Sequence, residues 1–441
     1  MRGRRPFLAL LGSAAAIVPL AGASGQVTTI PSLTASVGGA YSTNPFLTVD
    51  GEDSASVQLN VQPSLQLIDG ADTALITANY NRADYLTRYG SNSGYGGSVS
   101  GTTRPNARTT LGISASYDSQ VLGAQNGFAT PLNPILTSPV TGGSTTGTGV
   151  DVGTAPVVST PIVTNPVLTT PGLPIVNGDV GLIGLRQRRN TLSAGLTGSY
   201  APGPLSTWNA GVNVQRATYP GRNGNGEGLS LFASNFRSYG GNLGYNRSLT
   251  ELSSVGFQLS GTYVDYDSGT QTQIYTPRVT YSRTLSELTT LNVAVGAGIT
   301  HDEGGTFVSV AFDGTLCRNG ERLRGCAIVS RVPSATGLGG VRVQTTLGAN
   351  ATYTISPNTS ASASGNYVRV GAIQSDQAQV PVLGLGAQDY FTGDVSLQRR
   401  LGRMFSAVAS VSYRTASGIG ADIPGDITGR LGISVFLGQS R

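Results

Sequence analysis

Few residues of this 441-residue chain are of the types that catalyse reactions. Its single histidine, His301, is followed by Asp302 and Glu303. A hydrolytic site needs a nucleophile, a base and an orienting group brought together, and a lone histidine beside acids is more often solvated surface. The chain also has no lysine, which excludes a P-loop, a Schiff base and a Ser–Lys dyad. We therefore expect no enzyme and no cofactor, and keep a hydrolase that uses His301 only as a third hypothesis.

The two cysteines, Cys317 and Cys326, enclose a polar stretch within a long polar connection over 301–338. In an oxidising compartment, two cysteines this close in sequence usually form a disulfide that closes a small loop. A metal site would need further thiol or imidazole ligands, and His301 supplies the only imidazole. The sequence therefore predicts a Cys317–Cys326 disulfide and no metal site.

The first 23 residues have the organisation of a secretory signal peptide. A basic start is followed by an apolar stretch and by small residues that end at Ala23. The alternative, an N-terminal membrane helix, is disfavoured because the apolar stretch is short and contains Pro19. We expect residues 1–23 to be removed and the rest of the chain, 24–441, to be exported.

The composition disfavours a water-soluble protein and a nucleic-acid partner. Only 12% of the residues are charged, whereas about a quarter are charged in an average soluble domain. After removal of the first 23 residues, the chain has 25 arginines and 23 acidic residues, so the mature chain carries almost no net charge. This balance provides no basic surface for nucleic acid.

Strict alternation of apolar and polar residues predicts the elements that must position any functional side chains. It is clearest over 57–67 and 291–300, and recurs over 110–117, 405–413 and 427–437. A soluble sandwich also alternates, but its wet face usually carries charge, whereas here that face is mostly Ser, Thr, Asn, Gln and Gly. Tyrosines also gather near the expected strand ends, as in the aromatic girdles of membrane barrels. Tyr41, Tyr117, Tyr219, Tyr263 and Tyr413 form the set at one end of the strands, and Tyr200, Tyr245, Tyr281 and Tyr353 form the set at the other end.

The connections between these segments alternate between short turns and longer polar stretches. Seven short and eight long connections predict an all-β, transmembrane, up-and-down antiparallel barrel of about 16 strands, within a range of 14 to 18. Both ends of the chain then lie on one side, and the short turns face the periplasm. The longest connection, 119–187, contains a five-residue repeat that begins with proline at Pro156, Pro161 and Pro166. Such a segment either folds inward as a constriction or stays outside as an extracellular loop, and we prefer the external loop.

Side chains of one parity are expected to line the lumen. Amides and hydroxyls on such a wall would hydrate the channel without strong ion selectivity, which suits neutral or weakly charged solutes, sugars included. The alternative is a wettable interior without solute specificity. The candidate lumen residues are Gln58, Asn60, Gln62, Gln258, Arg278, Asn292, Arg342, Gln344, Asp394 and Arg430.

Two motifs resemble one bacterial outer-membrane β-barrel family. The stretch Tyr41-Ser42-Thr43-Asn44-Pro45-Phe46-Leu47 is similar to the opening of the family known as β-barrel porin 2. The turn Tyr245-Asn246-Arg247-Ser248-Leu249-Thr250-Glu251 is similar to its hairpin turns. The resemblance implies a barrel associated with exopolysaccharide systems. The proline repeat lies outside it, and the chain ends beyond Phe436 without the usual terminal aromatic residue.

The leading hypothesis is an outer-membrane channel for polar solutes, linked through the resemblance to exopolysaccharide export or assembly. The alternative is a structural barrel that anchors an envelope assembly through its loops without open-pore transport. Expected partners are outer-membrane lipid, the barrel insertion machinery and polysaccharide export components, but no nucleic acid.

Overall fold

A computed structural model describes residues 27–124, 179–184, 186–220, 233–371, 387–418 and 423–438. The predicted signal peptide and the proline repeat lie outside these residues. In the described part of the chain, no helix is long and apolar enough to cross a bilayer.

The described residues form eighteen strands and one short 3-10 helix, η2 (Val180–Leu182). The strands are β1 (Thr28–Ser42), β2 (Ser54–Asp69), β3 (Asp72–Tyr85), β4 (Ser91–Asn106), β5 (Thr109–Val121), β6 (Arg188–Gly203), β7 (Ser206–Thr218), β8 (Phe236–Thr250), β9 (Ser253–Tyr266), β10 (Gln271–Ser286), β11 (Thr289–Asp302), β12 (Gly305–Asn319), β13 (Leu323–Ala335), β14 (Val341–Ser356), β15 (Thr359–Val370), β16 (Gln388–Arg400), β17 (Phe405–Ser417) and β18 (Asp426–Gly438).

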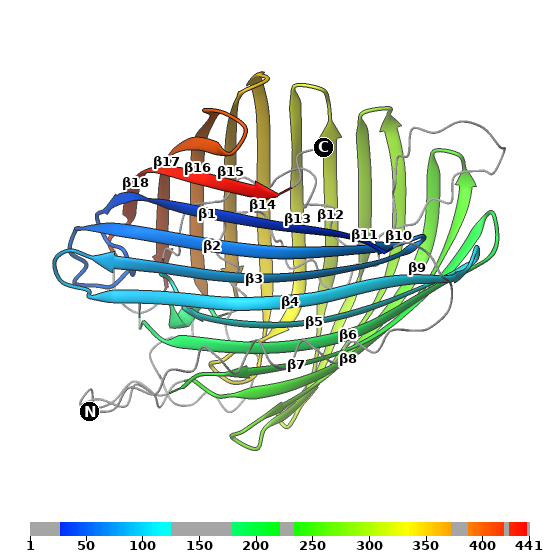
Figure 1. The fold of residues 1–441 in the computed structure, drawn as a ribbon. Coiled ribbons are helices and arrows are strands. Elements are labelled where there is room, and N and C mark those ends of the chain that lie inside the picture. Colours follow the sequence, from blue (N-terminus) through cyan, green and yellow to red (C-terminus); the bar gives the residue numbers. More distant parts are fainter. Residues whose placement is uncertain are drawn as a thin grey trace.

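Each strand pairs antiparallel with its sequence neighbours, and β18 pairs with β1, so the sheet closes into a barrel. In Figure 1 strands β1 to β8 cross in front of the wall formed by β10 to β17, as strands tilted against a barrel axis must do. The predicted class, an all-β up-and-down antiparallel barrel, is confirmed. Its 18 strands stand at the upper limit of the expected range.

The alternation of residues separates an apolar outer face from a polar inner face. On β2, Val57 is 49% exposed to the outside, whereas the intervening Gln58 is 2% exposed. Aromatic residues mark the outer face near both ends, with Trp208 packed against Tyr245 near the short turns. Tyr219 departs from the predicted girdle, because it is buried inside the barrel at 7% exposure.

The predicted long connection over 301–338 is wrong. It contains β12 and β13, which add the two strands that the sequence count missed. Cys317 and Cys326 do form a disulfide, but they lie opposite each other in the ladder of this hairpin, with their Cα atoms 4.1 Å apart. Arginines, glycines and Asp313 interrupt the apolar pattern of the two strands, which made the hairpin resemble a polar loop.

Candidate channel constriction

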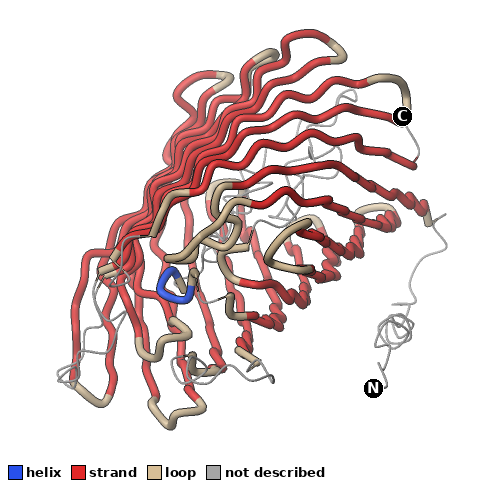
Figure 2. Tube along the Cα trace, turned by 90° about the vertical axis from the view of Figure 1, so that its left-hand side faces the viewer, coloured by secondary structure: helices blue, strands red, loops and turns tan. Residues whose placement is uncertain are grey.

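Several connections at one end of the barrel fold into its interior. At the other end, eight connections of two to four residues join the strands as tight turns, and we refer to these two ends as the long-connection end and the short-turn end. The inward segments are residues 43–48 between β1 and β2, 122–124 and 179–184 between β5 and β6, and 336–340 between β13 and β14. Figure 2 shows the helical turn η2 in the space enclosed by the strands. The preferred expectation of an external loop over 119–187 is therefore wrong for residues 179–184.

Helix η2 and the residue that follows it contribute to two hydrophobic clusters on different walls. Leu182 belongs to a cluster with Tyr219, Val264 and Tyr266, on the side of β7 to β10. Val180 and Ile183 belong to a second cluster, with Leu47, Val368, Val370, Tyr390, Ala416 and Ile423. Burial of an aliphatic side chain of this size contributes about 1.5–3 kcal/mol, so these contacts favour a fixed position inside the barrel.

A buried ion pair fixes the residue that precedes η2. The Asp179 carboxylate lies 2.8 Å from Nη1 of Arg189 on β6, and both side chains are almost fully buried. The same carboxylate accepts hydrogen bonds from the Tyr219 hydroxyl at 2.7 Å and from the Gly337 amide at 2.6 Å. Burial raises the pKa of Tyr219, and the Asp179 charge raises it further. Asp179 therefore joins three parts of the chain at one point.

A second buried ion pair fixes the other inward segments. Arg414 on β17 donates to Asp426 on β18, with Nη2 2.6 Å from Oδ2. The other oxygen of Asp426 accepts from the Ser42 hydroxyl at 2.6 Å and from the Asn44 amide at 3.0 Å. Arg414 also donates to the carbonyl of Gly123 at 2.6 Å and to that of Pro45 at 3.1 Å. One ion pair thus holds two connections that are far apart in sequence.

Aromatic residues pack around the inward segment 43–48 on the side of β3, and we refer to this group as the aromatic seal. Phe46 is fully buried against Tyr85 and Tyr89, with ring centroids 5.3 and 5.1 Å apart. The Arg186 guanidinium lies 4.3 Å from the Phe46 ring centroid, a cation–π distance. Leu47 follows with a φ of +52°, and its amide donates to the carbonyl of Asn44 at 3.1 Å.

The strand alternation puts the predicted lumen residues on the face opposite the exposed apolar side chains, except that Arg342 lies between Val341 and Val343, which are themselves buried. Arg278 forms an ion pair with Asp313 of β12. Arg342 donates to Gln388 at 3.3 Å, and Asn292 accepts from Ser282 at 2.6 Å. Two further amides contact nearby hydroxyls: Gln58 with Ser56 and Gln344 with Thr346. Asn60, Gln62 and Gln258 share this face, and so do Asp394 on β16 and Arg430 on β18. Their part in a solute path stays a prediction.

Sequence reasoning missed the residues that hold the constriction. Arg414 alternates in step with Ser410 and Ser412 and out of step with the exposed Val411 and Tyr413. The alternation could therefore have identified Arg414 as an inward-facing residue. Asp179 lies in a connection, where alternation gives no information. His301, in contrast, lies outside the constriction on an exposed strand end, where its Nδ1 is 2.9 Å from the Thr306 hydroxyl. Within the described residues, no group of three potential metal ligands comes together.

Comparisons with known proteins find structural likenesses at low sequence identity. No protein-family model and no curated protein matches the chain. Among solved structures, it is similar to the outer membrane protein opdK from Pseudomonas aeruginosa, with 11% identity, a TM-score of 0.41, and coverage of 93% of this chain and 99% of that one. It is also similar to Pseudomonas aeruginosa OccK2 (OpdF) in complex with glucuronate, with 11% identity, a TM-score of 0.43, and coverage of 93% of this chain and 98% of that one. A third similar structure is the anion-selective porin from Comamonas acidovorans, with 7% identity, a TM-score of 0.40, and coverage of 93% of this chain and 100% of that one. Likenesses this distant carry no argument about function, and the barrel rests on the chain's own strand pairing.

Proposed function

We propose that this protein is an outer-membrane channel for small polar solutes, narrowed by the segments that fold inward at the long-connection end. The observation that carries the proposal is the combination of a polar inner wall with connections pinned inside it by the two buried ion pairs, Asp179–Arg189 and Arg414–Asp426. A barrel that served only as an anchor would not need its loops fixed inside the lumen. Eighteen strands enclose a lumen wide enough for water and solute.

The charges of the inner wall support weak ion selectivity. Three arginines of the wall are paired with acids: Arg189, Arg278 and Arg414. Arg430 and Asp394 both face the lumen from nearby strands, so their opposite charges partly cancel. Neutral or weakly charged solutes fit such a wall better than strongly charged ones. A role in exopolysaccharide export, suggested by the sequence resemblance, stays a prediction about the solute.

Reconstitution tests this proposal. The protein purified in detergent and inserted into planar bilayers is expected to give discrete current steps with weak preference between potassium and chloride. Liposome swelling with sugars of increasing size would measure the width of the constriction. Absence of current from both the wild type and Asp179→Ala, each verified as a folded barrel, would contradict a channel and favour a purely structural barrel.

A further inference from the structure

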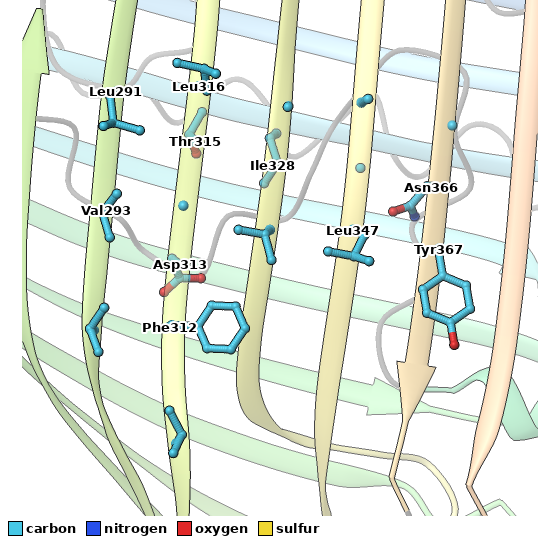
Figure 3. A pocket seen from close by; sticks show the side chains of 18 of the residues that line it. Leu291, Val293, Phe312, Asp313, Thr315, Leu316, Ile328, Leu347, Asn366 and Tyr367 are labelled. Carbon is cyan, nitrogen blue, oxygen red and sulfur yellow. The ribbon is translucent and has the colours of Figure 1, made fainter. Parts of the chain in front are cut away.

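The outer face of the barrel contains an apolar hollow of about 810 Å³ over β11 to β16. Figure 3 shows Phe312, Leu347 and Tyr367 on three of the strands that border it, with the opposite wall of the barrel behind them. Val310, Val329 and Phe391 are among its other apolar lining residues. Because these residues alternate with inward-facing ones, the hollow opens toward the membrane and not toward the lumen.

Small residues create the depth of the hollow. Gly314, Ala327, Ala349 and Gly365 line it between the larger side chains. A Cβ atom added at Gly365 would meet only the carbonyl oxygen of Thr392, at 4.0 Å, so the space beside this glycine is open. A larger side chain at this position would therefore enter the hollow without a clash against the backbone.

A polar row borders the hollow one step closer to the long-connection end. Arg331, Thr345 and Arg369 lie opposite one another on β13, β14 and β15, so all three share the outer face. Their neighbours in the next row are Val329, Leu347 and Tyr367, which belong to the hollow. Two strand spacings separate the arginine backbones by about 10 Å. The row and the hollow thus form one continuous amphipathic surface.

The positive charge of this row is only partly balanced. Arg331 donates to the Thr345 hydroxyl at 3.0 Å, and no described carboxylate lies within 4 Å of its guanidinium. Arg369 has Asp389 on its far side, at 3.9 Å from Nε. An arginine on a membrane-facing surface is costly without an anionic partner, and the guanidinium fork matches phosphate geometry.

We propose that the hollow and the polar row bind one membrane lipid, with an acyl chain in the hollow and its phosphate between Arg331 and Arg369. A second copy of the chain is the alternative occupant of the hollow, and sedimentation of the wild type and Gly365→Leu distinguishes it from a lipid. The proposal requires that the barrel lies in a bilayer, but it does not require that the barrel conducts.

Brominated lipids and a single tryptophan reporter test the site. Trp208→Phe removes the only tryptophan, and Phe312→Trp places a new one at the edge of the hollow. In mixed detergent micelles, brominated phosphatidic acid is expected to quench this tryptophan at lower concentration than brominated phosphatidylcholine. Arg331→Gln should reduce that preference about fivefold, the effect of one interfacial cation. Gly365→Leu should reduce quenching by both lipids, because it fills the hollow.

Arg237→Gln is the matched control, since Arg237 is exposed on the outer face of β8, away from the hollow. It should leave the lipid preference unchanged. Equal quenching by the two lipids, or a preference that survives Arg331→Gln, would overturn the proposal. So would sedimentation that shows a dimer abolished by Gly365→Leu, because a second copy would then occupy the hollow. Loss of conductance with an intact lipid preference would contradict only the channel.

Discussion

The two buried ion pairs of the constriction differ in which partner belongs to the wall. In the Arg414–Asp426 pair, both charges lie on strands, and the connections contribute backbone and hydroxyl groups around them. In the Asp179–Arg189 pair, the wall supplies only the arginine, and the acid belongs to the inward segment. Loss of Asp426 leaves a buried arginine that cannot move away. Loss of Asp179 leaves its segment held by hydrophobic packing alone, so that local opening of this segment brings water to Arg189. Similar ion pairs should therefore contribute differently, the first to stability and the second to the width of the channel.

The largest expected effect is on stability. Asp426→Ala should lower the free energy of unfolding by about 4 kcal/mol, because it leaves Arg414 buried without its counterion. Urea titration of the protein in lipid vesicles would measure this. Asp84→Ala, which removes the exposed pair with Arg82, is the control and should change the free energy by less than about 1 kcal/mol. Equal losses in the two variants would show that the Arg414–Asp426 pair contributes no more than a surface pair.

Asp179→Ala should have a smaller effect on stability, about 2 kcal/mol, because the released segment allows Arg189 to be hydrated. Its main consequence should be local. Amide hydrogen exchange of residues 180–183 should become much faster while exchange in the strands stays slow. Asp394→Ala, which removes another carboxylate of the inner face, should leave exchange at 180–183 unchanged. Slow exchange in Asp179→Ala would mean that hydrophobic packing alone holds η2.

The raised pKa of Tyr219 predicts how the Asp179 anchor responds to alkali. Because the folded state disfavours the phenolate, stability should be constant below the ordinary tyrosine pKa of about 10 and fall as the pH rises above it. Tyr219→Phe should reduce the slope of unfolding free energy against pH above about pH 10. An unchanged slope would indicate that Tyr219 becomes accessible before the barrel unfolds.

The smallest effect is expected at the aromatic seal, which involves neither ion pair. Arg186→Gln should lower the free energy of unfolding by about 1 kcal/mol, the contribution of a partly buried cation–π contact. In a Phe46→Leu background, Arg186→Gln should lower the free energy of unfolding by less, because the aromatic ring is already absent. A double-mutant cycle of these two substitutions therefore measures the coupling between the two residues. Additive losses would contradict a direct interaction.

Much of the barrel could be predicted from the sequence, because alternation reports directly on which face each residue occupies. The same parity places Gln58 and Arg430 on the inner face. The constriction could not be predicted in this way, because its contacts join residues far apart in sequence, such as Asn44 and Asp426, which are separated by 382 positions. The apolar pair Phe46 and Leu47 in a polar connection was a local signal that this connection folds inward. Residues 305–335 misled the count because charged residues interrupt their alternation.

Single-channel conductance of the wild type and Asp179→Ala in planar bilayers tests the central claim most directly. If the segment pinned by Asp179 narrows the channel, the wild type conducts in discrete steps and Asp179→Ala conducts in larger ones, while Asp84→Ala matches the wild type. Equal step sizes for the wild type and Asp179→Ala, in a variant whose residues 180–183 exchange rapidly, would contradict a constriction at this place.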